Sequence, residues 1–155
     1  MAFCLMPNHF HLVLRQKKEN GVPLFMKKLG GGYAMYFNEK YQRVGSLFQG
    51  RFKAIAVADE AYFLQLSRYV HLNPAGLAER GWKDKGIGDW RKVGEFLENY
   101  RWSSYLDYIG KKNFPSLTSR EFLLEMFGGN PVEYGKFVRE WLPGDLNRLG
   151  DIALE

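Results

Sequence analysis

Two histidines separated by one residue, His9 and His11, are the first side chains in the sequence that suit chemistry. They stand in an apolar segment in which Phe10, Leu12 and Leu14 alternate with them, a pattern that predicts a strand. Because side chains alternate between the faces of a strand, both imidazoles point to the same side. Neighbouring imidazoles are suitable ligands for a divalent metal ion. The pattern fits either such a pair or two partly exposed histidines without a ligand.

A second candidate set lies on a helix predicted over residues 61–73. Asp59 suits the N-cap of this helix, and Pro74 disfavours helix at the residue before it. Tyr69 and Asn73 are one turn apart and share a face. Taken alone, Tyr69 is typical of a core tyrosine and Asn73 of an asparagine at a helix end.

Packed against the histidine strand, the same two side chains would instead complete a site. That site would hold two imidazoles, an amide oxygen and a phenol. His71 points away from the face of Tyr69 and Asn73, so we expect His71 at the surface.

The elements that must position these residues alternate between strand and helix. Strands are predicted over residues 2–6 and 9–15, separated by a turn at Pro7-Asn8, and over residues 47–57. A helix is predicted from Pro23 to about Arg43. The glycine triplet at 30–32 marks a weakened or kinked part of that helix, or a close approach of the backbone.

After residue 75 the sequence predicts a long loop over residues 76–92, which is followed by helices. One is expected near residues 91–98 and a second from Thr118 or Ser119 to Gly128. A third is expected from residue 131 to about 142, with Asn130 as its cap.

The composition bounds the class of protein. The chain has 155 residues, enough for one compact domain, and no apolar run long enough to cross a bilayer. Cys4 is the only cysteine, which excludes an intrachain disulfide and fits a core position in a cytoplasmic protein. The net charge of +5 favours an anionic partner, nucleic acid first, although many basic proteins bind none.

Four blocks of the sequence, taken together, are similar to one family. They are Met-Pro-Asn-His-Phe-His-Leu at 6–12, Leu-Phe-Gln-Gly-Arg-Phe at 47–52, Arg-Tyr-Val-His-Leu-Asn-Pro-Ala-Gly-Leu at 68–77 and Trp-Ser-Ser-Tyr at 102–105. In this order they resemble the single-tyrosine HUH transposases, the group that includes the transposases of the smallest bacterial insertion sequences. The closest likeness is to the REP-associated tyrosine transposases.

The resemblance implies an α+β fold, in which helices pack on a ferredoxin-like antiparallel sheet and a helical extension follows. We expect a catalytic domain over residues 1–110, the extension over 111–143 and a tail over 144–155. The family has a strand and a helix before the histidine motif, whereas this chain starts about five residues before it. We therefore expect that strand and helix to be missing, through a misassigned start or a truncation.

The resemblance also implies the chemistry. His9 and His11 match the family's metal-binding pair, Asn73 matches the position that completes the metal site, and Tyr69 matches the nucleophile. The implied cofactor is Mg²⁺ or Mn²⁺, and the implied partner is single-stranded or hairpin DNA. Attack by Tyr69 would leave a 5′-phosphotyrosine and a free 3′-hydroxyl, which allows rejoining without ATP.

Basic side chains supply candidate phosphate contacts, although each one alone is more commonly a solvated surface charge. Arg51 and Lys53 are expected on one face of the strand predicted over 47–57, and Lys17 and Lys18 lie in a predicted loop. The DNA-binding candidates are Lys27, Lys28, Arg43, Arg51, Lys53 and Arg68.

Three other interpretations remain open from the sequence: the two functions described next and a purely structural protein. The first is a truncated, inactive module that binds hairpin DNA without cutting it. The second is a metal-dependent nuclease that uses an activated water, which the lack of a carboxylate cluster near the histidines disfavours. For this chain we expect a monomer or a homodimer in the cytoplasm, without a membrane partner.

Overall fold

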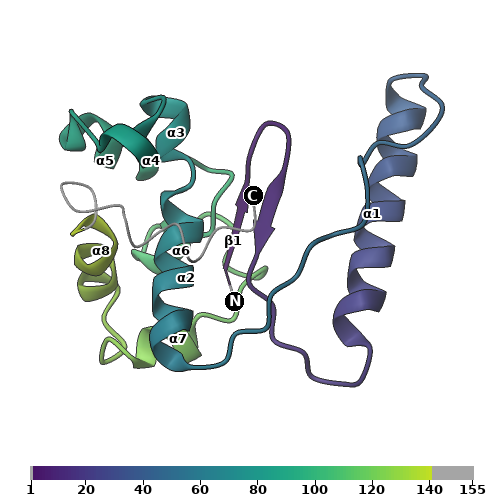
Figure 1. The fold of residues 1–155 in the computed structure, drawn as a ribbon. Coiled ribbons are helices and arrows are strands. Elements are labelled where there is room, and N and C mark those ends of the chain that lie inside the picture. Colours follow the sequence, from purple (N-terminus) through teal and green to yellow (C-terminus); the bar gives the residue numbers. More distant parts are fainter. Residues whose placement is uncertain (1, 141–155) are drawn as a thin grey trace. The chain divides into compact units, whose positions relative to one another are not determined.

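The computed structural model describes residues 2–140, without side-chain placement for residues 83 and 84 (Figure 1). The predicted tail over 144–155 lies outside the described residues. The chain divides into two compact units. The first contains residues 2–13 and 57–140, and the second contains residues 14–56.

The first unit is built on a β-hairpin. Strand β1 (Phe3–Leu5) pairs antiparallel with β2 (Phe10–Leu12), and Cys4 lies opposite His11. The two strands predicted around the Pro7-Asn8 turn are thus confirmed, although each is shorter than expected. Cys4 is fully buried, as predicted for a core residue.

The second edge of β1 is also occupied. The backbone N–H of Leu5 donates to the carbonyl oxygen of Trp102 at 2.8 Å, and that of Ser104 donates to Phe3 at 3.0 Å. Between them, Cys4 and Ser103 form an isolated antiparallel bridge. The segment around Ser103 therefore continues the sheet beside β1 for one residue pair.

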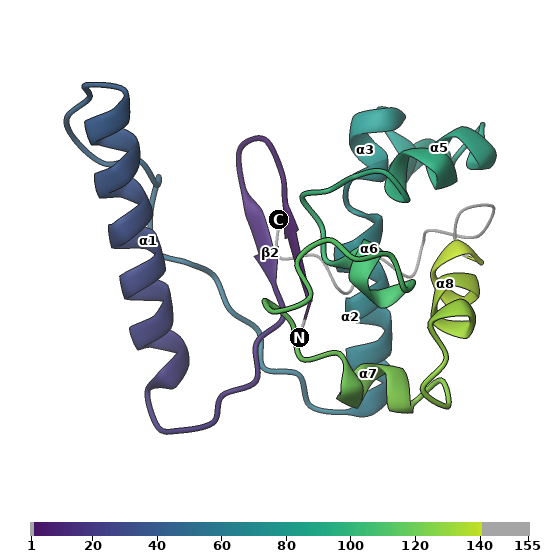
Figure 2. The same cartoon turned by 180° about the vertical axis from the view of Figure 1, so that it is seen from behind.

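Helix α2 (Glu60–Leu72) lies beside this hairpin in both views (Figures 1 and 2). Its N-cap is Asp59, as predicted, and the Asp59 carboxylate accepts a hydrogen bond from the N–H of Tyr62 at 2.7 Å. Every residue from Ser67 to Leu72 is buried. A run of six consecutive buried residues covers all sides of a helix, so the second half of α2 is enclosed by the fold.

The C-terminal part of this unit is helical. Helix α8 (Pro131–Arg139) packs on α2, and the Asn130 side chain caps it by accepting from the N–H of Val132 at 3.0 Å. The remaining helices of residues 75–125 are α3 (Ala75–Ala78), α4 (Trp82–Lys85), α5 (Trp90–Leu97), α6 (Tyr105–Tyr108) and α7 (Glu121–Glu125).

Two expectations for this region are wrong. The loop predicted over 76–92 contains most of α3, all of α4 and the start of α5, because Trp82 is buried and draws the chain into the core. A Cβ at Gly76 would lie 3.2 Å from Nε1 of Trp82, so glycine allows this close approach. The cap predicted at Thr118 or Ser119 is also wrong: α7 starts after Arg120, and Thr118 Oγ1 accepts from the Arg120 guanidinium instead.

The second unit contains α1 (Gly21–Lys40), a helix of 20 residues. The predicted helix is confirmed, and it continues through Gly30–Gly32 without a break. A Cβ at Gly30 would lie 3.8 Å from the Phe48 ring, so the segment after the helix folds back onto α1 here. Tyr33 also faces Phe48, with ring centroids 6.4 Å apart.

The strand predicted over 47–57 is wrong. These residues have no regular secondary structure, and those from Gln49 to Val57 are all exposed. The alternating pattern of Phe52, Ile55 and Val57 favours a strand, but a strand needs a hydrogen-bonded neighbour. No such neighbour exists for this segment within residues 2–140.

The predicted α+β class, with helices on an antiparallel sheet, is confirmed. Within the described residues the sheet has two strands, ordered β1-β2. None of the described helices combines the length and apolar character required to span a membrane.

Candidate functional site

The two predicted histidine ligands meet at the end of the β-hairpin. Nε2 of His9 lies 3.1 Å from Nε2 of His11, and their rings are nearly perpendicular, with centroids 4.9 Å apart. The pair forms because the turn at residues 7–8 brings His9 to the start of β2. Both imidazoles then project from the same face, as the sequence pattern predicts.

The His9 ring has a second polar neighbour, Asn8. Asn8 Oδ1 lies 2.7 Å from Nδ1 of His9, the ring nitrogen that does not face His11. A carbonyl oxygen accepts, so this contact favours the tautomer of His9 that has its proton on Nδ1 and leaves Nε2 for a ligand. Asn8 is a positioning residue that sequence reasoning did not single out; its place directly before His9 was the available signal.

The spacing of the pair fits one divalent cation. Ligands about 2.1 Å from an ion and at right angles to each other are about 3 Å apart, which is close to the separation of the two Nε2 atoms. Residues 2–140 contain no cluster of three or more His, Cys, Asp and Glu side chains for a metal. A cation at this pair would therefore need an amide oxygen, phosphate or water as its other ligands.

Tyr69 of α2 lies next to this pair. Its ring centroid is 5.6 Å from that of His11, and the rings meet edge to face at 85°. Only 3% of Tyr69 is exposed. Three of the four predicted catalytic and metal-binding side chains, His9, His11 and Tyr69, therefore lie side by side.

Asn73, the fourth, follows α2 and is fixed to the same turn. Both its backbone N–H and its Nδ2 donate to the carbonyl oxygen of Tyr69, at 3.1 Å and 3.0 Å. This arrangement holds the amide one turn beyond Tyr69 and commits Nδ2. The oxygen Oδ1 is the atom of Asn73 that suits a cation.

His71 was expected at the surface and is instead fully buried. The expectation failed because α8 covers the side of α2 that faces away from Tyr69. Nδ1 of His71 lies 2.6 Å from Oη of Tyr134 in α8, and Nε2 lies 2.8 Å from Oγ of Ser104. Burial lowers the pKa of the His71 imidazole to about 3.

Arg68 is 5% exposed, which differs from an ordinary surface cation. Its guanidinium carbon lies 3.5 Å from the ring centroid of Phe137 in α8, and Nη2 lies 4.0 Å from Glu140. These contacts pack α2 against α8. The predicted DNA contact of Arg68 stays a prediction.

The other five DNA-binding candidates are exposed residues of the second unit: Lys27, Lys28, Arg43, Arg51 and Lys53. Arg43 stacks over the Phe37 ring at 5.6 Å near the end of α1. The strand that was to align Arg51 with Lys53 is not formed, so their shared face is lost.

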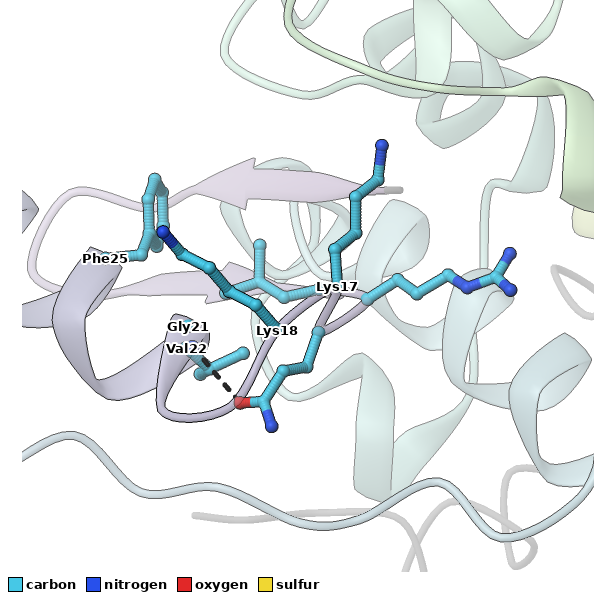
Figure 3. Close-up of a pocket in the computed structure, with 8 residues that line it drawn as sticks. Lys17, Lys18, Gly21, Val22 and Phe25 are labelled. Carbon is cyan, nitrogen blue, oxygen red and sulfur yellow. Dashed lines mark hydrogen bonds between the residues drawn. The ribbon is translucent and has the colours of Figure 1, made fainter.

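The second unit also has a shallow pocket of about 260 Å³ at the start of α1 (Figure 3). Lys17 and Lys18 extend from its loop in different directions, and the Lys18 side chain runs toward Phe25. Gln16 Oε1 accepts from the N–H of Val22, which satisfies one donor of the helix end. The complete lining is Leu14, Arg15, Gln16, Lys17, Lys18, Gly21, Val22 and Phe25.

Among the comparisons with known proteins, a match was found only for the N-terminal part of the chain. Residues 1–73 match the family model described as "Transposase IS200 like". The match covers His9, His11, Tyr69 and Asn73. No curated protein and no solved structure matches the chain.

Proposed function

We propose that this chain, whose residues 1–73 match the IS200-like transposase model, is a transposase of that family that cleaves and rejoins single-stranded DNA with Tyr69 as the nucleophile. Membership of this family would make DNA the partner and transposition the general function. The observation that carries the finer proposal is the contact between the rings of Tyr69 and His11. This contact supports the proposal because it puts the ring of Tyr69 beside one of the two imidazoles.

The reaction requires a phenolate and a neutralised phosphate. A phenol is a poor nucleophile near its reference pKa of about 10. His9, His11 and Asn73 would hold Mg²⁺ or Mn²⁺, which when bound stabilises negative charge on the phenol and the phosphate oxygens. The side chains of the chain itself then orient the nucleophile and fix the distance of attack.

The bonds balance without ATP or another co-reactant. Oη of Tyr69 attacks the phosphorus and loses its proton, the bond from phosphorus to the 3′-oxygen breaks, and that oxygen is protonated. The products are a 5′-phosphotyrosine and a 3′-hydroxyl. A second 3′-hydroxyl attacks the same phosphorus and releases Tyr69, so that the energy of the phosphodiester is retained.

A labelled-DNA assay tests this function. The substrate is a library of single-stranded oligonucleotides, each with a randomised hairpin and flanks, incubated with the protein and Mn²⁺. We expect the 3′-end label to migrate with the protein on a denaturing gel and the 5′-end label to appear in a shorter free strand. Tyr69→Phe should abolish the adduct, whereas Tyr62→Phe on the same helix should keep it.

Other products would indicate other functions. Free 5′-phosphate ends, formed with multiple turnover and also by Tyr69→Phe, would indicate that an activated water attacks the phosphorus in place of Tyr69. DNA binding without any cleavage would leave a binding module. Either result contradicts the proposed role of Tyr69.

A further inference from the structure

The imidazole of His71 is fully buried and has a hydrogen-bond partner at each ring nitrogen. It lies on α2 between Tyr69 and Asn73, and three tyrosine rings surround it. Their centroids lie 5.6 Å (Tyr105), 5.0 Å (Tyr108) and 5.7 Å (Tyr134) from that of His71. Successive residues of a helix are rotated by about 100°, so His71 points to the side opposite Tyr69. It is therefore too far round the helix to touch the nucleophile.

The first hydrogen bond of His71 leads to the sheet. Nε2 lies 2.8 Å from Oγ of Ser104, and the same oxygen accepts from the N–H of Phe3 in β1 at 2.8 Å. The N–H of Ser104 returns a bond to the carbonyl of Phe3. Because β1 pairs with β2 and Cys4 lies opposite His11, this contact joins the helix of Tyr69 to the hairpin of the histidine pair.

The second hydrogen bond leads to α8. Nδ1 of His71 lies 2.6 Å from Oη of Tyr134, which in turn is 3.3 Å from Oγ of Ser67. Ser67 donates to the carbonyl of Leu64 at 2.7 Å. The hydroxyl of Ser104 lies 2.8 Å from Nε2 of His71 and 3.1 Å from the carbonyl oxygen of Phe3, and its single proton goes to one of the two. When it goes to Nε2, Nδ1–H of His71 donates to Tyr134 and Tyr134 donates to Ser67. A complete buried network of this kind fixes one packing geometry.

We propose that His71 is a further positioning residue of the site, holding α2 against β1 through Ser104 and against α8 through Tyr134. In this role it sets the position of Tyr69 relative to His11. The effect on catalysis rests on the proposed function of Tyr69. The effect on the geometry does not, which allows the two to be tested separately.

The mildest test removes one hydroxyl. Tyr134→Phe keeps the aromatic ring and loses the bond to His71. Tyr105→Phe is the matched control, because Tyr105 also packs on His71 while its buried Oη has no hydrogen-bond partner among the described residues. Both variants are compared with the wild type by the single-turnover rate of adduct formation, by DNA affinity and by thermal unfolding.

We expect Tyr134→Phe to slow adduct formation by about ten- to hundred-fold, the usual result of a small misplacement of a reacting group. DNA affinity should be unchanged, and the fold should be retained at the assay temperature. Tyr105→Phe should react like the wild type. A Tyr134→Phe variant that only melts at a lower temperature, at an unchanged rate, would overturn the proposal.

Conservative variants of His71 separate its two bonds. Gln places an amide near the former Nε2 and can keep the contact with Ser104, whereas Asn places one near the former Nδ1 and can keep the contact with Tyr134. Because the link to the sheet positions His11, we expect His71→Gln to retain more activity than His71→Asn. The opposite order would contradict the role of Ser104.

A structural readout separates failure of this inference from failure of the proposed function. Nuclear Overhauser contacts between the ring protons of Tyr69 and His11 report the geometry without DNA or metal. They should weaken in Tyr134→Phe and persist in Tyr105→Phe even if the wild type forms no adduct. Unchanged contacts in Tyr134→Phe would remove His71 from the positioning of Tyr69.

Discussion

Nε2 of His9 lies 3.1 Å from Nε2 of His11, and Asn8 Oδ1 lies 2.7 Å from Nδ1 of His9. The short hairpin thus places the two Nε2 atoms side by side, with the Asn8 side chain against the other ring nitrogen of His9.

The first prediction concerns Asn8. Asn8→Ala removes the acceptor that orients the His9 ring, and loss of such an outer partner commonly lowers metal affinity by about 10- to 100-fold. We expect that loss in a titration with Mn²⁺ followed by calorimetry. Asn99→Ala is the control, since its amide bonds only the carbonyl of Glu95 among the described residues. Equal affinities for the two variants would show that Asn8 does not orient the pair.

The second prediction concerns pH. His71 has a pKa of about 3 in the folded protein and about 6.5 in the unfolded chain. As the pH falls below 6.5 the unfolded chain binds the proton first, so stability falls by up to about 1.4 kcal/mol per pH unit until about pH 3. Urea unfolding between pH 7 and pH 5 should show a loss of about 2 kcal/mol from this group.

His71→Phe lacks the titrating group and supplies the comparison. It will be less stable than the wild type at pH 7, but its stability should decline less between pH 7 and pH 5. Since carboxylates titrate in both proteins, the difference between the two declines isolates His71. Parallel declines would mean that the imidazole is not held neutral in the fold.

The third prediction concerns two buried tyrosines. Tyr105 Oη has no hydrogen-bond partner among the described residues, whereas Tyr134 Oη bonds His71. Removing a buried hydroxyl without a partner relieves its desolvation, and removing a bonded one leaves its partner unsatisfied. We expect Tyr105→Phe to raise the free energy of unfolding by about 1 kcal/mol and Tyr134→Phe to lower it by about 1–3 kcal/mol. Urea denaturation measures both, and a loss of stability in Tyr105→Phe would refute the assignment.

The fourth prediction concerns the pocket at the start of α1. If Lys17 and Lys18 contact phosphates, the double change to Gln should reduce the slope of log affinity against log salt by up to about 0.7 per lysine for single strands. Phe25→Ala should weaken binding by about 1–3 kcal/mol through lost stacking and leave that slope unchanged. Fluorescence anisotropy with a labelled oligonucleotide over a salt series separates the two effects.

Lys136→Gln is the control for charge, because Lys136 is paired with Glu133 at 2.7 Å. It should alter the slope little. A slope that changes equally in both proteins would indicate a general effect of net charge in place of contacts at the pocket.

The sequence predicts the hairpin and α2 well because their signals are local. Pro7-Asn8 sets the turn, Asp59 sets the start of α2, and alternation places both histidines on one face. The same kind of local pattern predicts that His9 and His11 share one face of a strand and that Tyr69 and Asn73 share one face of a helix. Their spacing along one strand and one helix is a property of a few neighbouring residues.

The predictions that are wrong concern residues whose structure depends on segments far away in the sequence. The strand predicted over 47–57 depends on a hydrogen-bonded neighbour that no local pattern reveals. His71 was assigned to the surface because one buried face per helix was assumed, whereas Tyr134 arrives from 63 residues away to cover the other. Helices as short as α3 and α4 contain too few residues for a periodicity to be detected.

The bond between His71 and Tyr134 has a consequence for how such proteins can be recombined. The family match ends at residue 73, yet Ser104, Tyr105, Tyr108 and Tyr134 contact His71 near the end of α2. A segment cut at the limits of the family match would contain the proposed site residues and lack these partners of His71. A chimaeric protein that keeps these contacts therefore needs more of the chain than residues 1–73, with its junction after α8.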